Sequence, residues 1–247
     1  MRAKKAGTAM TPAQLFTYDL PLFAGLTETD LEGFDLGLSE LSLQPWQTIF
    51  DQDDASNDLY FLLSGALLAV LWTSEGREIV FSRFRIGAYF GELAAFDGVP
   101  RSLAVVAKTE ARVLVMKRKS FLKLFNEVPL IRERVALELV SRIRILTLRN
   151  LEMTTLTVEQ RVGAYLLRLA AEHGGVTTGA VIENAPTHAE IAGSIGANRE
   201  MVSRSISKFA KRGAIKSSRQ RIEICDPETL TEELGDVMSR EYDLAKT

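Results

Sequence analysis

The sequence predicts an α+β protein with an N-terminal β-roll, a long helix and a C-terminal winged helix-turn-helix domain. Three observations lead to this fold class. Short apolar runs separated by turns fill residues 46–118, a helical stretch without Gly or Pro follows, and two capped short helices lie further on. A chain of 247 residues is long enough for two modest hydrophobic cores.

The apolar runs of the first half predict the strands of an antiparallel roll. The runs DLYFLLSG, ALLAVLW, REIVFSRF, LAVVA and RVLVM are rich in Val, Leu and Phe, and polar turns such as TSEG separate them. We expect a jelly roll, that is, a double-stranded β-helix. Ahead of it, PLFAGLTETDLEGF predicts a short helix capped by Thr27 or Thr29, with Leu31 and Phe34 on one side.

A long helix follows the roll. The stretch IRERVALELVSRIRILTLRNLEM holds 23 residues without Gly or Pro. Apolar residues recur in it at intervals of four and three, the period of a two-stranded coiled-coil seam, and one polar residue interrupts them as a register-setting position would. The seam comprises Leu139, Ile143, Leu146, Asn150 and Met153. We expect this helix to form a dimer; the alternative is an amphipathic helix packed on its own domain.

Capping patterns mark the helices of the second half. Thr157 and Gln160 form a capping box that starts one helix, and Thr187 and Glu190 form a second box. Gly196 ends the helix that the second box starts, and Asn198 caps the next. Two short helices joined by a turn with Gly are typical of a helix-turn-helix, and AIKSSRQRIEI adds two short strands as a wing.

The second helix of this motif carries the chemistry of a DNA reader. Val202, Ile206 and Phe209 form one apolar stripe, so Ser207 and the charged residues lie opposite. Residues 199–221 hold eight Lys or Arg and one acid, a patch suited to phosphates. The residues expected to face DNA are Thr187, Asn198, Arg199, Glu200, Ser203, Arg204, Lys208, Lys211 and Lys216. The alternative is a solvated helix face with a Glu200–Arg204 ion pair.

In the first half, FGELAAFDGVPRS predicts a ligand-binding loop. Gly91 allows close backbone approach, Arg101 supplies a charged fork for a phosphate, and Ser102 adds a hydroxyl donor. Glu92 can accept from a sugar hydroxyl. A molecule with one phosphate and one ribose fits these groups; the alternative is a tight turn with a surface arginine.

The motifs together resemble one known family. FGELAAFDGVPRSLAVVA is similar to the phosphate-binding cassette of cyclic-nucleotide-binding domains, and THAEIAGSIGANREMVSRSISKFAKRGAIK is similar to the reader of the same family. From about Pro21 to Pro227 the chain resembles the family of the cyclic-AMP receptor protein and the fumarate and nitrate reduction regulator (CRP/FNR). The order of the parts agrees with this family as well.

The resemblance implies specific roles for residues of the first half. Glu92 would hold the ribose 2′-hydroxyl, Arg101 and Ser102 the cyclic phosphate, and Gly91 and Leu93 the backbone around it. Cyclic-AMP-responsive members contact adenine with two adjacent hydroxyl residues of the long helix. Here Thr147 fits that pattern, whereas Leu146 departs from it. Asp53 stands where many members have a turn glycine.

In the reader, the resemblance implies that Arg199, Glu200 and Arg204 contact a palindromic site with TGTGA-like halves. It also implies RNA polymerase as a partner of the DNA-bound protein. The iron–sulfur branch is not expected, because its N-terminal cysteine cluster is absent. A haem is not expected because residues 1–172 hold no His or Cys, and with one Cys and two His in the chain we expect no metal.

These expectations combine into a domain plan. We expect a sensor roll at 15–130, a dimerisation helix at 131–153, a hinge at 154–156, the DNA-binding domain at 157–230 and an acidic tail at 231–247. No secretion signal or membrane span is evident, so a cytoplasmic location is expected.

The function expected is a homodimeric transcription regulator controlled by cyclic AMP, or alternatively cyclic GMP. A second interpretation is a related regulator that is ligand-independent or uses another ligand. A third is a cyclic-nucleotide sensor that acts through protein contacts. No catalytic motif is present, so an enzyme is not expected.

Overall fold

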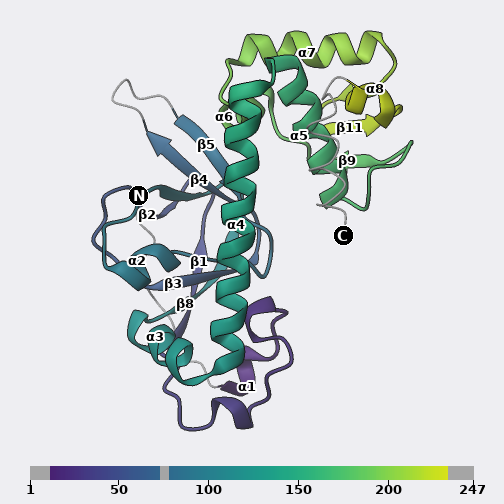
Figure 1. Ribbon diagram of the computed structural model, residues 1–247. Coiled ribbons are helices and arrows are strands. Elements are labelled where there is room, and N and C mark those ends of the chain that lie inside the picture. The colour runs from purple at the N-terminus through teal and green to yellow at the C-terminus, as the bar shows by residue number, and fades with distance from the viewer. Residues whose placement is uncertain (1–11, 73–77, 233–247) are drawn as a thin grey trace. The chain divides into compact units, whose positions relative to one another are not determined.

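The structure is a computed structural model that describes residues 12–72 and 78–232 (Figure 1). The basic N-terminal segment MRAKKAGTAM, the turn TSEG and nearly all of the expected acidic tail lie outside the described residues. The chain forms two compact units, which divide between Ser141 and Arg142. Among the described residues, no helix combines the length and apolar character needed to cross a membrane.

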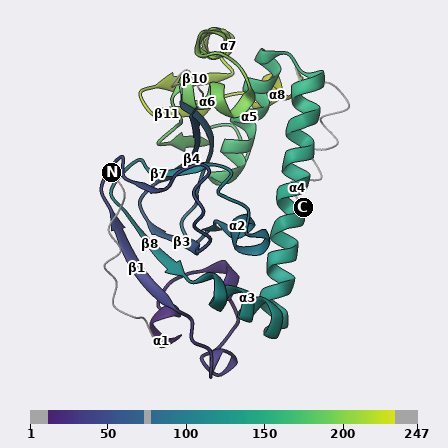
Figure 2. The same cartoon turned by 90° about the vertical axis from the view of Figure 1, so that its left-hand side faces the viewer.

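The first unit is built on two antiparallel four-stranded sheets. One sheet has the order β1-β8-β3-β6 and the other β2-β7-β4-β5. Strands β1 and β8 run side by side over their whole length, as Figure 2 shows. The strands are β1 (Leu38–Leu43), β2 (Thr48–Phe50), β3 (Leu59–Ser64), β4 (Leu67–Trp72), β5 (Glu78–Arg83), β6 (Tyr89–Phe90), β7 (Ala104–Ala107) and β8 (Ala111–Met116).

Strand β3 shows how the roll builds two cores at once. Successive side chains of a strand point to opposite faces. Leu59 and Phe61 therefore pack into a core that the helices cover, while Tyr60 and Leu62 pack into a core with the second sheet. All four side chains are buried, which explains why the run DLYFLLSG is continuously apolar.

Helices close one end of the roll. They are α1 (Pro12–Leu15), the 3-10 turns η1 (Pro21–Phe23) and η2 (Thr29–Leu31), α3 (Arg118–Glu127) and the start of α4 (Pro129–Thr155). Phe121, Leu124 and Ile131 from α3 and α4 are fully buried against the sheet. The expected cap by Thr27 or Thr29 is wrong, because Glu28 precedes η2 without a side-chain cap and Thr27 instead donates to Asp30.

Helix α4 crosses the division between the units and continues through Thr155. The amide of Leu156 still donates to the carbonyl of Glu152, and Thr157 caps α5 (Val158–Glu172). The expected hinge at 154–156 therefore comprises Thr154 and Thr155 of the last helical turn of α4 and Leu156 directly after it. The break in helical structure itself lies at Leu156 and Thr157.

The second unit packs three helices on a small sheet. Helix α5 contacts α6 (His188–Ile195) and α7 (Arg199–Lys211), and strands β10 (Ile215–Ser218) and β11 (Arg221–Ile224) form the expected wing. A third strand, β9 (Val181–Glu183), pairs with β11, and α8 (Pro227–Glu232) packs on α5. The sequence patterns did not indicate β9, because three residues carry too little periodicity.

The end of α4 belongs to this second core. Leu148 and Leu151 pack against the buried residues of α5, α6 and α7. Glu152, only 3% exposed, forms an ion pair with Arg168 of α5. Helices α5, α6 and α7 and the last turns of α4 therefore form one packed body.

Candidate ligand-binding and DNA-binding sites

The predicted ligand loop folds around a short helix between two left-handed glycines. Gly91 (φ 86°) precedes α2 (Glu92–Asp97), and Gly98 (φ 74°) follows it. Both positions favour glycine because a Cβ atom strains this backbone conformation. The side chain of Glu92 is buried at 4% exposure, so the loop holds a carboxylate inside the roll.

Arg101 is the centre of the loop, and its side chain is also buried, at 3% exposure. Its Nη1 donates to the Gly91 carbonyl (2.8 Å) and its Nη2 to the Asp58 carbonyl (2.6 Å). Its Nε donates to Ser56 Oγ (3.2 Å), and the guanidinium lies 4.2 Å from the centre of the Phe50 ring. Burial lowers the pKa of Arg101 from its ordinary value, although an arginine so shifted still carries its charge at pH 7.

A guanidinium has five N–H donors, so three bonds to the protein leave capacity for an anion. The loop thus provides a buried cation and a buried carboxylate in the same segment.

The segment before β3 holds the loop in place through its backbone. The amide of Asp53 donates to the Arg101 carbonyl (2.8 Å), and the amide of Arg101 donates to the Asp54 carbonyl (2.9 Å). Asp53 has φ 62°, a left-handed conformation that Asp tolerates better than most residues. The residue that departs from the family's glycine therefore keeps the backbone conformation of a turn glycine.

Asp58 connects this site to α3. Its carboxylate accepts from Lys117 Nζ (3.0 Å) and from the amide of Arg118 (3.3 Å). Arg118 Nε in turn donates to the Ala95 carbonyl of α2 (2.7 Å). Asp58, Ser56 and Phe50 contact Arg101. No pattern in the sequence pointed to these three residues, because nothing in one sequence marks a carbonyl or a ring as an arginine partner.

The structure brings Gly91, Glu92 and Arg101 together but leaves two other predicted residues at the surface. Ser102 is exposed, and Leu93 on α2 is 54% exposed. Leu146 and Thr147 belong to α4 within the second unit. Leu146 is 62% exposed, and Thr147 Oγ1 donates to the Ile143 carbonyl (3.0 Å).

Helices α5, α6 and α7 are capped as the sequence predicts. Both Thr–x–x–Glu/Gln boxes form completely, at Thr157 and at Thr187. Asn198 Oδ1 accepts from the Met201 amide (2.8 Å), and Gly196 ends α6 in a left-handed conformation. These local bonds satisfy backbone groups that a helix start leaves free.

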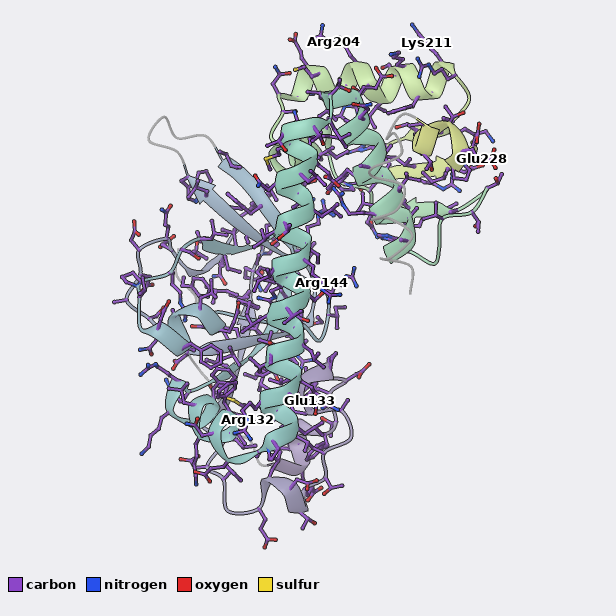
Figure 3. All side chains as sticks on the ribbon, in the orientation of Figure 1. Arg132, Glu133, Arg144, Arg204, Lys211 and Glu228 are labelled. Atoms are coloured by element: carbon purple, nitrogen blue, oxygen red, sulfur yellow. The ribbon has the colours of Figure 1, made fainter. Side chains whose placement is uncertain are left out.

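Helix α7 separates an apolar face from a basic one. Val202, Ile206 and Phe209 are buried, whereas Arg199, Glu200, Arg204, Ser207 and Lys211 are exposed. Arg204 and Lys211 both project from the outer side of α7, as Figure 3 shows. A shallow groove there is lined by Ser203, Arg204, Ser207, Lys208 and Lys211. Among the described residues, Glu200 and Arg204 form no ion pair with each other.

Several predicted DNA contacts are also bonded within the protein. Lys208 pairs with Glu159 (2.5 Å), and Lys216 pairs with Glu223 (3.3 Å). Ser203 Oγ lies 2.7 Å from Nδ1 of His188. No pattern in the sequence marked His188 as a functional residue.

The predicted dimer seam lies on an apolar stretch of α4 that is largely open to solvent. Ile143 and Leu146 are both 62% exposed and Met153 is 48% exposed, while Asn150 is exposed as well. Leu139 differs, because it is half-buried against the core of the roll.

Comparison with known proteins agrees with this arrangement. Residues 40–128 match the family described as "Cyclic nucleotide-binding domain", and residues 160–233 match "Crp-like helix-turn-helix domain". The CRP-like cAMP-activated global transcriptional regulator of Mycobacterium tuberculosis is 28% identical over 210 residues, which cover 85% of this chain and 94% of that protein. The cAMP-activated global transcriptional regulator CRP of Escherichia coli is 27% identical over 176 residues, covering 71% of this chain and 84% of that protein.

Solved structures show the same fold. A transcriptional regulator of the CRP/FNR family from Thermus thermophilus is 25% identical with a TM-score of 0.62, and the match covers 79% of this chain and 97% of that one. FixK2 from Bradyrhizobium japonicum, at 20% identity, has a TM-score of 0.69 and covers 81% of this chain and 98% of that one.

Proposed function

Since the chain belongs to the CRP/FNR family of transcription regulators, with a cyclic-nucleotide-binding domain and a Crp-like DNA-binding domain, we propose that a cyclic nucleotide controls its affinity for DNA. It is a regulator and not an enzyme. The observation that carries the proposal is the buried Arg101, held beside Gly91 and in the same loop as buried Glu92.

Cyclic AMP is the ligand we propose, with cyclic GMP as the alternative. The relatives from Mycobacterium tuberculosis and Escherichia coli are named as cAMP-activated, which supports the first. In the proposed complex Arg101 and Ser102 hold the phosphate, Glu92 the ribose, and Gly91 and Leu93 border it. Leu146 and Thr147 contact the base. Because Leu146 offers no hydroxyl, the base contact would rest on Thr147 and on apolar packing.

Calorimetry of the full chain with cyclic AMP, with cyclic GMP and with 5′-AMP tests the ligand. We expect saturable binding of a cyclic nucleotide, abolished by Arg101→Gln and kept by Lys119→Gln, a control at an exposed site of α3. Saturating nucleotide should also raise the affinity for a DNA duplex, and by linkage DNA should tighten nucleotide binding by the same factor. If neither cyclic nucleotide binds or changes DNA affinity, the remaining interpretation is a regulator that is ligand-independent or uses another ligand.

For DNA, we propose a palindromic site with TGTGA-like halves. Arg199 and Arg204 each present a fork that fits guanine, and Glu200 can accept from cytosine. Thr187, Asn198 and Ser203 lie around them, and Lys208, Lys211 and Lys216 supply charge for phosphates. Arg199→Ala should cost about 1–3 kcal/mol of binding free energy on the cognate duplex and relax base preference. Lys211→Ala should instead weaken binding to all duplexes evenly and lower the slope of log affinity against log salt concentration by about 1.

We further propose that α4 forms the dimer, with Leu139, Ile143, Leu146, Asn150 and Met153 at the seam. The exposed apolar side chains of α4 support this, because a contiguous apolar patch on a protein surface is typical of a contact with another protein chain. Ile143→Glu should yield monomers in analytical ultracentrifugation, whereas Glu133→Gln at an exposed site of the same helix should not. A monomer in the unmodified chain would refute the dimer. RNA polymerase as partner and a cytoplasmic location follow from the family role.

A further inference from the structure

Ser56 accepts a hydrogen bond from the buried guanidinium of Arg101. Arg101 Nε donates to Ser56 Oγ (3.2 Å), and the amide of Ser56 donates to Asp54 Oδ1 (3.0 Å), which fixes the turn that carries the serine. The other two acceptors of this arginine are the backbone carbonyls of Gly91 and Asp58. Among the described residues, Ser56 is therefore the one whose side chain accepts a hydrogen bond from Arg101.

These three bonds decide which N–H groups of Arg101 are left for a ligand. A guanidinium has one N–H on Nε and two on each of its terminal nitrogens. Ser56 accepts from the single N–H of Nε, while Gly91 accepts from Nη1 and Asp58 from Nη2. One N–H on Nη1 and one on Nη2 remain. The ring of Phe50, whose centre lies 4.2 Å from Cζ, packs on the guanidinium and helps to hold its plane.

Two N–H groups on neighbouring nitrogens match a cyclic phosphate better than a phosphate monoester. A cyclic phosphodiester presents two free oxygens and carries one negative charge, and a bidentate arginine can bind both oxygens. A monoester presents three oxygens and carries a charge of about −1.5 to −2 at pH 7. Arg101 has no N–H left for the third oxygen. A charged acceptor that enters a buried site without a donor loses affinity, because it has given up its water.

The charges around Arg101 favour the ligand with the smaller negative charge. Burial lowers the pKa of Arg101, whereas Tyr60 and three carboxylates act in the opposite direction. These carboxylates belong to Asp54, Asp58 and Glu92, so they lie close enough to act on the guanidinium. They also repel a second negative charge on the ligand. Glu92 is only 4% exposed, and buried charges are weakly screened.

We propose that Ser56 is a specificity-determining residue that limits Arg101 to two free donors, so that the site selects a cyclic phosphodiester over a phosphate monoester. The proposal rests on the proposed binding of a cyclic nucleotide at Arg101. Ser56 acts through the arginine and is thus a positioning residue for the phosphate contact. Without its hydroxyl, Nε becomes a third free donor and the guanidinium can turn. The fit to the diester is then poorer, and the fit to the monoester is better.

Calorimetry of the full chain compares the cyclic nucleotide that binds with the 5′-monophosphate of the same base, measured by competition. We expect Ser56→Ala to bind the cyclic nucleotide about two- to tenfold more weakly, the size of one net hydrogen bond. It should bind the 5′-monophosphate at least as tightly as the unmodified chain, so the ratio of the two affinities falls. Ser56→Thr keeps the hydroxyl and should keep this ratio.

Ser42→Ala is the matched control, because Ser42 is an exposed serine on strand β1 of the same roll. It should leave both affinities unchanged. Thermal melts of each variant report the fold. If Ser56→Ala lowers the melting temperature, Ser56→Cys takes its place, since a thiol is close in size to the hydroxyl but is a weak acceptor.

The proposed function and the role of Ser56 fail in different ways. If the unmodified chain binds neither cyclic AMP nor cyclic GMP, the proposed ligand is wrong and the role of Ser56 fails with it. If the chain binds one of them but Ser56→Ala lowers the affinity for both phosphates by the same factor, Ser56 has a structural role only and the proposal is wrong. Unchanged affinities in Ser56→Ala, or an equal fall of the ratio in Ser56→Thr, would also overturn it.

Discussion

Replacing Gly91 by alanine probes the contact on which the ligand site depends. An alanine Cβ at position 91 would lie 2.6 Å from Arg101 Nη1 and 3.1 Å from the Asp58 carbonyl oxygen. The backbone oxygen cannot move easily, so the guanidinium must shift away. It would then lose its 2.8 Å bond to Gly91 or its 2.6 Å bond to Asp58.

Gly98→Ala is the matched control, because Gly98 has a similar left-handed φ but an alanine Cβ there would meet no atom within 4 Å. Both substitutions add backbone strain of about 1–2 kcal/mol. Gly91→Ala should add about 2 kcal/mol more, since a hydrogen bond to a charged group contributes about 1.5–3 kcal/mol. We therefore expect Gly91→Ala to lower the free energy of unfolding by about 3–4 kcal/mol in total.

Urea unfolding followed by tryptophan fluorescence measures this difference in the roll, because both tryptophans of the chain, Trp46 and Trp72, lie in it. Calorimetry with cyclic AMP gives the functional effect, and we expect Gly91→Ala to lose more than about tenfold in affinity while Gly98→Ala keeps it. Equal destabilisation and equal ligand affinity of the two variants would refute the reasoning about Arg101.

Three further substitutions test other contacts. Glu152→Gln should lower the unfolding free energy of the second unit by about 3 kcal/mol in circular dichroism melts, because it removes the charge that pairs with half-buried Arg168. Changing both residues to leucine should restore most of the loss. Equal melting temperatures for the single and the double variant would contradict this. Asp53→Val should cost about 1–2 kcal/mol at its left-handed φ in urea unfolding, and Asp53→Gly should not. The hydrogen bond from Arg112 lowers the pKa of Glu40, so that pair stabilises the roll above about pH 4.5, and this contribution is lost as pH falls through the lowered pKa. Arg112→Ala should therefore cost less than about 1 kcal/mol of unfolding free energy at pH 7, and the cost should shrink as the pH falls below 4.5.

Local patterns in the sequence were enough to place most elements of the fold. The capping boxes at Thr157 and Thr187 act between residues three positions apart, so they can be recognised without knowing the fold. The apolar stripe of Val202, Ile206 and Phe209 follows from helical periodicity in the same way. The patterns did not indicate strand β9, because three residues carry no such period, and the short helix expected after Thr27 is the three-residue 3-10 turn η2.

The sequence by itself determined the fold class, the capped reader helices and the loop with Gly91, Glu92 and Arg101, because each rests on neighbouring residues and their spacing. Only the tertiary structure decided which groups those residues meet. Arg101 donates hydrogen bonds to Ser56 and Asp58, more than forty positions away, and His188 is hydrogen-bonded to Ser203 on another helix. Such pairs form where chain packing brings distant segments together, and one sequence carries no periodic signal for them.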